Sequence, residues 1–181
     1  MMQGARSPGV GLLLVGAVAC SSSGAGDWTK AKAKTMEGAI KGATLTIELP
    51  STMKPMPKDL VPAGTAAFAI YTGDRNLVAN VKIEALSLEP SFERDSAGAL
   101  QQGYTLMDEQ PGASTYSFAY RKVGQPGASG RVYRAEAEML VRCTWELPET
   151  RVKGSTFVEW PVLKRACESI KLTPSGRTEP A

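Results

Sequence analysis

The sequence predicts an α+β domain built on an antiparallel β-sheet. Short segments with alternating polar and apolar residues recur along most of 43–173, and turn-forming residues separate them. A helical period replaces this alternation twice, once in mid-chain and once near the end. The expected order is strand, loop, hairpin, helix, hairpin, helix. A short mid-chain helix and a C-terminal helix should therefore pack on the sheet.

The first strand is expected in ATLTIELP, residues 43–50. Leu45, Ile47 and Leu49 alternate there with polar residues, so one face of the strand is apolar. The next stretch, 50–64, is rich in proline and is predicted to be an irregular loop.

A hairpin should follow this loop. AAFAIYTG ends in a turn-forming Gly73-Asp74 pair, and LVANVKIEALSLE, residues 77–89, again alternates between apolar and polar residues. The period then changes, and a short helix is predicted over about 92–102. Ser91 is a suitable N-cap, Glu93 and Asp95 fall in the first turn, and Gly103 ends the helix.

Two longer strands are expected after this helix. In the first, 115–123, the residues Tyr116, Phe118 and Tyr120 share one face. The second, 131–147, is long for one strand, so it should bend or break. Its apolar or small residues occupy the odd positions Tyr133, Ala135, Ala137, Met139, Val141, Cys143 and Trp145.

The chain should close with a helix over 161–172, PVLKRACESIKL. Leu163, Ala166, Cys167 and Ile170 fall on one helical face, and Pro161 suits the first turn. The order of elements, and an ending in which a helix runs into ACESIKL, resembles the PsbP-like fold over about residues 44–172. The resemblance implies a central antiparallel sheet flanked by helices, and a non-enzymatic accessory or binding protein. It assigns no functional residue.

The N-terminus carries an apolar run, Val10–Ala19, that is too short to span a membrane as a helix. A charged residue precedes the run and small residues follow it, which is the layout of a secretory signal peptide. AVAC, ending at Cys20, resembles the lipobox of bacterial lipoprotein signals. The resemblance implies cleavage before Cys20, acylation of its thiol and amino group, and attachment to a membrane through these lipids. The alternative is an ordinary secreted protein with a free thiol.

These observations divide the chain into four parts: a signal peptide over 1–19, a lipidated cysteine and flexible linker over 20–42, one α+β domain over 43–173, and a disordered tail over 174–181. The basic run KAKAK within 30–34 is interpreted as solvated linker. Contact of its lysines with anionic headgroups is the alternative. The expected location is the bacterial cell envelope. Ser21, in place of an aspartate, is compatible with the outer membrane.

Composition excludes several function classes. The chain has no histidine, which removes His-based nucleophilic systems and His-ligated zinc sites. It has no phosphate-binding glycine motif and no concentrated basic face, so neither a nucleotide cofactor nor a nucleic-acid partner is expected. No cofactor or metal is predicted, and the protein is not expected to be an enzyme. Carboxylate chemistry is what remains, with Asp108 and Glu109, or Glu93 and Asp95, as the candidates, although such pairs are usually solvated surface.

The leading functional hypothesis is a lipid-anchored accessory module that binds an envelope protein through its sheet face or its proline-rich loop. One alternative is a carrier of an apolar ligand, which a pocket lined by Tyr116, Phe118, Tyr120 and Met139 would favour. The other is an envelope enzyme with two carboxylates facing across a cleft. Trp145 and Trp160 are expected in the core rather than on a ligand platform.

The remaining cysteines are Cys143 and Cys167. If Cys20 carries lipid, these two are left to pair with each other, and both lie on apolar faces of predicted elements. A disulfide between them is predicted, as suits an exported protein. The alternatives are two buried reduced thiols or, with less support, a zinc site.

Overall fold

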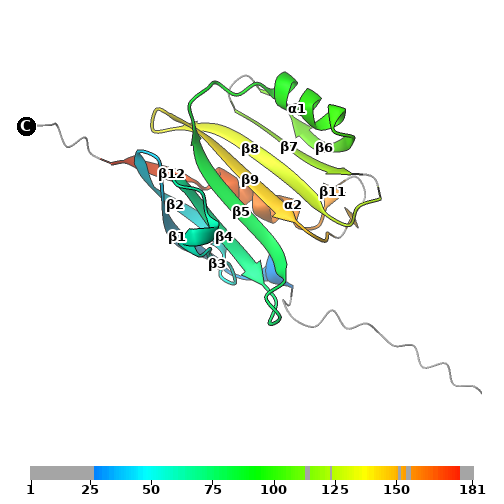
Figure 1. The fold of residues 1–181 in the computed structure, drawn as a ribbon, viewed down its shortest axis with the longest axis horizontal. Helices are drawn as coiled ribbons and strands as arrows, with labels where there is room; N and C mark the ends of the chain where they lie inside the picture. The colour runs from blue at the N-terminus through cyan, green and yellow to red at the C-terminus, as the bar shows by residue number, and fades with distance from the viewer. Residues whose placement is uncertain (1–26, 113–114, 123, 151, 154–155, 176–181) are drawn as a thin grey trace, which may run out of the picture.

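A computed structural model describes residues 27–112, 115–122, 124–150, 152–153 and 156–175 (Figure 1). Its main feature is an antiparallel sheet of seven strands. In spatial order these strands are β3 (Lys54–Pro55), β4 (Thr65–Tyr71), β5 (Leu77–Leu86), β9 (Met139–Leu147), β8 (Ala128–Glu136), β7 (Tyr116–Lys122) and β6 (Tyr104–Gln110). The predicted antiparallel sheet with two α-helices is therefore confirmed, with strands as the dominant element.

A second antiparallel sheet packs on one face of the first. It contains β1 (Ala33–Ile40), β2 (Ala43–Pro50) and β12 (Lys171–Pro174). The α-helices are α1 (Phe92–Gln101) and α2 (Trp160–Glu168). The single-turn 3-10 helices are η1 (Trp28–Lys30) and η2 (Lys58–Leu60). The short strands β10 (Val152–Lys153) and β11 (Thr156–Phe157) pair with each other as a two-stranded antiparallel sheet.

The main core lies between the two sheets and α2. The apolar faces predicted for β2, β5 and α2 all point into it. Leu45, Ile83, Trp145 and Leu163 are each fully buried there. The helix α1 covers the other face of the seven-stranded sheet, over β6 and β7 (Figure 1). The two faces of this sheet thus have different environments.

The long strand expected over 131–147 is in fact a hairpin. Ala137 and Glu138 have φ angles of 48° and 64°, and this two-residue turn joins β8 to β9. The register pairs Val132 with Cys143, an even position with an odd one. Odd positions of β8 and β9 therefore lie on opposite faces, and the single apolar face predicted for this segment is wrong.

The domain begins earlier than predicted. Residues 33–40, assigned to the flexible linker, form β1, which pairs with β2 along its whole length. The strand escaped detection because its inward positions are Met36, Gly38 and Ile40, and Gly38 is not apolar. A Cβ at Gly38 would lie 3.0 Å from the Cβ of Ala66, so a small residue suits this contact between the sheets. Trp28 is also buried.

Other boundaries also differ from the prediction. The strand β6 was not expected, and its pattern is interrupted by an irregular register near Asp108, whose φ is 49°. The final helix ends at Glu168 instead of Leu172, because the chain turns there and continues as β12. Ser169 secures this turn, since its Oγ accepts a hydrogen bond of 2.8 Å from the amide of Glu48 in β2. Pro174, assigned to the disordered tail, is the last residue of β12. Within the proline-rich loop, 50–64, the structure adds β3 and η2.

Candidate functional site

Cys143 of β9 and Cys167 of α2 form a disulfide in the main core, as predicted. Their Cα atoms are 5.7 Å apart, and both residues are almost completely buried. The bond fastens the C-terminal helix to the centre of the large sheet. Cys20, the predicted lipidation site, lies outside the described residues.

The aromatic face predicted for β7 is present, but it forms a small second core. Tyr116, Phe118 and Tyr120 pack with Tyr133 of β8 and lie under α1. Phe92 at the start of α1 makes edge-to-face contacts with the rings of Tyr116 and Phe118, at centroid distances of 5.6 and 6.0 Å. These rings fill the space that a carried ligand would need.

Met139 does not join this cluster. It packs against the main core, on the opposite face of the sheet from the aromatic residues of β7. The reversal of faces at the β8–β9 turn explains the separation. The structure therefore does not form the apolar pocket that was expected from Tyr116, Phe118, Tyr120 and Met139.

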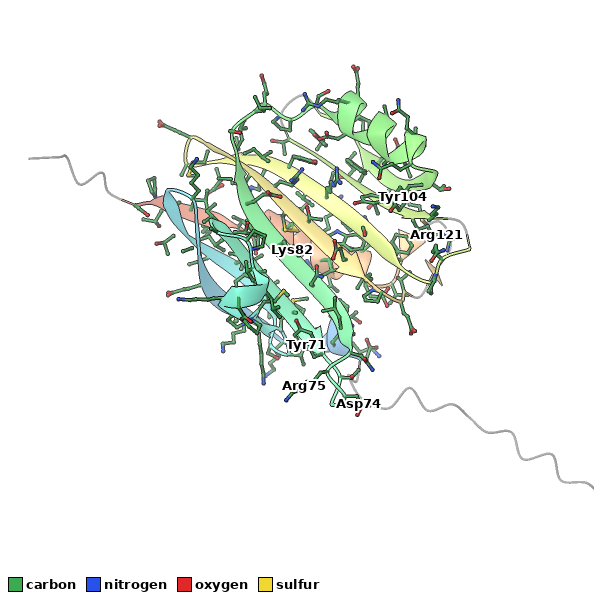
Figure 2. The ribbon with its side chains drawn as sticks, viewed as in Figure 1. Tyr71, Asp74, Arg75, Lys82, Tyr104 and Arg121 are labelled. Atoms are coloured by element: carbon green, nitrogen blue, oxygen red, sulfur yellow. A yellow bond between two sulfur atoms is a disulfide. The ribbon has the colours of Figure 1, made fainter. Side chains whose placement is uncertain are left out.

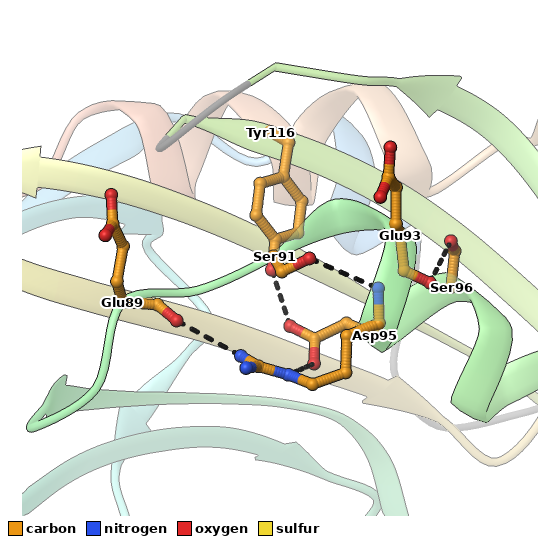
Figure 3. A network of polar contacts seen from close by, with 7 residues as sticks. Glu89, Ser91, Glu93, Asp95, Ser96 and Tyr116 are labelled. Carbon is orange, nitrogen blue, oxygen red and sulfur yellow. Dashed lines mark hydrogen bonds and ion pairs between the residues drawn. The ribbon is translucent and has the colours of Figure 1, made fainter.

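A polar contact connects this second core to the start of α1 (Figure 3). The Ser91 hydroxyl accepts a bond of 3.3 Å from the amide of Arg94, which confirms the predicted N-cap. Asp95, in the first turn, accepts a hydrogen bond from the Tyr116 hydroxyl. Burial, followed by this bond to Asp95, raises the pKa of Tyr116 far above its ordinary value. Burial also raises the pKa of Tyr133.

These tyrosines predict a loss of stability at alkaline pH. As the pH rises above about 10, the unfolded chain releases phenolic protons that the native state keeps, and the free energy of unfolding falls by about 1.4 kcal/mol per pH unit for each such tyrosine. Tyr116→Phe should make this slope shallower by the contribution of one tyrosine, about 1.4 kcal/mol per pH unit. Urea unfolding between about pH 8 and about pH 11 measures it. Tyr71→Phe, at an exposed residue, controls for the loss of one phenol from the chain. An unchanged slope in Tyr116→Phe would contradict the interpretation.

The candidate catalytic carboxylates are either exposed or engaged with neighbouring side chains. Asp108 and Glu109 lie on β6 rather than in a loop, and both are exposed. Glu93 is exposed on α1, while Asp95 is engaged with Tyr116 and with Arg94. Among the described residues, no group of three or more Cys, Asp and Glu gathers closely enough to hold a metal ion.

Both tryptophans expected in the core are buried there. The rings of Trp145 and Trp160 lie 5.1 Å apart between centroids, and Trp145 also meets Phe157 edge-on. These contacts come from β9, α2 and β11. They brace the C-terminal helix against the sheet beside the disulfide.

The part of the large sheet that α1 leaves uncovered carries paired charges, among them Lys82, which Figure 2 labels. Arg142 of β9 donates to Glu84 of β5, through Nε at 2.8 Å and Nη2 at 2.7 Å. On the same two strands, Glu146 accepts a bond of 2.9 Å from the Asn80 amide and lies 3.8 Å from the Lys82 ammonium. Alternation along the strands predicted these polar positions. Their partners across the sheet depend on the register and could not be read from one strand alone.

A groove of about 520 Å³ lies where the strands of the large sheet end, beside this polar surface. We call it the strand-end groove. Its polar and aromatic lining includes Tyr104, Tyr120, Arg121, Lys122, Ser129 and Glu146. The rings of Tyr104 and Tyr120 meet edge to face at 5.1 Å, and the Arg131 guanidinium lies 5.5 Å from the centre of the Tyr120 ring. Sequence analysis missed this groove because its residues come from five strands and the turns between them.

Two cations, Arg121 and Lys122, line the groove. Within the part of the chain that the structure describes, neither Arg121 nor Lys122 forms an ion pair with a carboxylate. Lys122 is exposed and Arg121 is half-buried (Figure 2 labels Arg121 beside Tyr104). The groove therefore presents two cations that form no ion pair among the described residues, together with two tyrosine rings and the Glu146 carboxylate, which is paired with Lys82.

Comparison with known proteins adds little. No protein family matches the chain. No curated protein matches it. A crystal structure of a protein from Bacteroides thetaiotaomicron VPI-5482, at 1.50 Å resolution, is similar with a TM-score of 0.38 and 15% identity. The match covers 76% of this chain and 47% of that one, so the chain spans less than half the length of that protein. In the described residues, no helix has the length and hydropathy needed to cross a bilayer.

Proposed function

We propose that the protein is a lipid-anchored bacterial envelope lipoprotein that acts as a non-enzymatic binding module. The observation that carries the proposal is the use of the cysteines. The Cys143–Cys167 disulfide suits an oxidising compartment outside the cytoplasm. It leaves Cys20, at the end of AVAC, as the remaining thiol. An exposed free thiol is unfavourable in such a compartment, whereas an acylated one anchors the domain.

A binding role for an envelope protein partner is supported by the uncovered face of the large sheet. Its ion pairs Glu84–Arg142 and Lys82–Glu146 lie on rigid central strands, and their side chains are partly exposed. Non-obligate protein interfaces are about as polar as an ordinary protein surface, so this face is suitable for a reversible partner. The PsbP-like assignment belongs to this proposal, since that resemblance implies the same accessory role. Placement in the outer membrane rests on Ser21 and is part of the proposal as well.

The anchor is tested by Cys20→Ser. With wild-type protein in its native membrane, we expect partition into the detergent phase and a mass that includes a diacylglyceryl group and an amide-linked acyl chain. The serine variant should move to the aqueous phase or accumulate as the uncleaved precursor, because serine offers no thiol to acylate. Ser21→Ala, which leaves the thiol in place, is the matched control and should partition like the wild type. A correctly cleaved serine variant that remains in the detergent phase would refute the anchor.

The binding role is tested separately in cells. Chemical crosslinking of the lipidated protein, followed by mass spectrometry, should recover a defined partner through the lysine of the uncovered face, Lys82. Glu84→Lys with Arg142→Glu preserves the ion pair but exchanges its charges, and it should weaken recovery of that partner. Turnover of a hydrolase substrate that is abolished by changing one carboxylate would instead favour an enzyme.

A further inference from the structure

The strand-end groove lies at the same end of the domain as the start of the described chain. Register shows this end of the large sheet directly: Tyr71 pairs with Leu77, Ala128 with Leu147, and Tyr104 with Lys122. Each of these residues is the first or the last of its strand, so the three pairs mark one end of the sheet. We call this the anchor-proximal end, for the reason that follows.

The smaller sheet brings the N-terminus to this end. Ala33, which begins β1, pairs with Pro50, which ends β2. The chain then continues through Met53, and Lys54 in β3 pairs with Ala69 near the end of β4. The helix η1 contacts β2, and in the view of Figure 1 the described chain begins toward the same end as the β4–β5 hairpin tip.

The length of the tether limits how far this end can lie from the membrane. Six residues lie between Cys20 and Asp27, so seven Cα-to-Cα steps join them. A fully extended chain spans at most about 3.6 Å per residue, so Asp27 can lie no more than about 25 Å from an anchored Cys20. This is shorter than the long strands of the domain, which rise about 3.4 Å per residue over ten residues in β5. If Cys20 is acylated, the anchor-proximal end is therefore the one held near the bilayer.

The charge at this end suits an anionic surface. Lys32, Lys54 and Arg75 are exposed here, in addition to Arg121 and Lys122 in the groove, and none of them forms an ion pair within the described residues. The acidic residues at this end include Asp27, Asp74, Glu146 and Glu149, and Glu48 and Glu159 lie close to it. Two of them already have cationic partners: Asp27 lies 3.0 Å from Lys30, and Glu146 is paired with Lys82.

Tyrosines accompany the cations. Tyr71 is 41% exposed at the hairpin tip, beside Arg75 (Figure 2), and Tyr104 and Tyr120 line the groove. Tyrosine is favoured at the level of lipid headgroups because its ring is apolar and its hydroxyl is polar. The groove combines two cations that form no ion pair within the described residues with the half-buried ring of Tyr104, which suits the phosphate group of an acyl-bearing lipid.

We propose that the anchor-proximal end is a membrane-docking surface, and that the strand-end groove, with the cations Arg121 and Lys122 in its lining, takes the phosphate of an anionic phospholipid headgroup. The inference rests on the proposed lipid anchor, which brings this end to the bilayer. Docking would fix the orientation of the domain and turn the opposite end, with the β1–β2 turn, away from the membrane. It also leaves the uncovered face of β5 and β9 accessible from the side for a protein partner.

The test uses the mature chain with Cys20→Ser, so that acyl chains do not contribute, and sedimentation with vesicles of phosphatidylcholine, with or without phosphatidylglycerol. Binding is expected only with the anionic lipid, and it should weaken as salt is raised. Each basic residue near an anionic surface contributes about fivefold to the affinity, so Arg121→Gln with Lys122→Gln should weaken binding by about 25-fold.

The control removes equal charge elsewhere. Lys41→Gln with Lys171→Gln changes two exposed lysines outside the anchor-proximal end, in the β1–β2 turn and in β12. This variant should bind within about twofold of the parent, because its lysines lie beyond about one Debye length from the docked surface. Unchanged urea midpoints in both double variants would show that the fold is retained.

Several results would overturn the proposal. These are equal binding to neutral and anionic vesicles, equal losses in the two double variants, or an affinity for inorganic phosphate in the groove without vesicle binding. Because the protein in this assay carries no lipid, the outcome is independent of acylation at Cys20. A failure of the anchor in the partition experiment can thus be distinguished from a failure of the groove.

Discussion

Replacing Cys143 and Cys167 together by alanine should lower the free energy of unfolding by about 3.5 kcal/mol. The bond closes a loop with a sequence separation of 24 residues, and the chain-entropy relation gives this value for a loop of that length. A typical domain has a total stability of about 5–15 kcal/mol, so the loss is a large share. The bond joins β9 to α2 inside the main core, and the variant should lose the packing of the C-terminal helix first.

Urea unfolding of the mature chain with Cys20→Ser provides the measurement. The same Cys20→Ser chain with Cys143 and Cys167 intact, treated with a reductant, should approach the stability of the double alanine variant, because both lack the same constraint on the unfolded chain. The oxidised protein should contain no thiol reactive in denaturant. A loss below about 1 kcal/mol, or two reactive thiols in the unreduced protein, would show that the pair does not act as a stabilising disulfide.

Gly130→Ala is expected to destabilise the protein by about 3 kcal/mol or to prevent folding. Gly130 lies in β8 opposite Trp145, and a Cβ there would lie 2.2 Å from the Cζ2 atom of the indole. The ring cannot move away freely, since it is fully buried against Trp160 and Phe157. Overpacking a rigid core usually costs about 1–3 kcal/mol, and a contact this short should fall at the upper end of that range.

Gly98→Ala is the matched control, because it adds the same methyl group at a site with open space. Gly98 lies inside α1, and a Cβ there would meet nothing within 4 Å. Since glycine in a helix interior is less favourable than alanine by about 0.5–1 kcal/mol, this variant should be stabilised by roughly that amount. Similar urea midpoints for Gly130→Ala and the wild type would show that Trp145 is not held as the structure has it.

Much of the local structure followed from the sequence, because it depends on neighbours a few residues apart. The two-residue alternation of Leu45, Ile47 and Leu49 located β2, and the Ser91 cap located the start of α1. The apolar face of α2 located Cys167 in the core, and the odd positions of β9 did the same for Cys143. The disulfide was therefore predictable once the lipobox resemblance had assigned Cys20. Acylation of Cys20 itself stays a prediction.

The tertiary structure decided what depends on residues far apart in the chain. A two-residue turn at Ala137-Glu138 places the odd positions of β8 and the odd positions of β9 on opposite faces of the sheet. Tyr133 therefore points away from the main core. The alternation within each strand is unchanged by the turn. Gly130 resembles a turn residue in the sequence, and only the register places it under Trp145. The strand-end groove combines residues from five strands and the turns between them. Periodicity records which face a side chain occupies, but which distant side chains share that face is set by strand order and register.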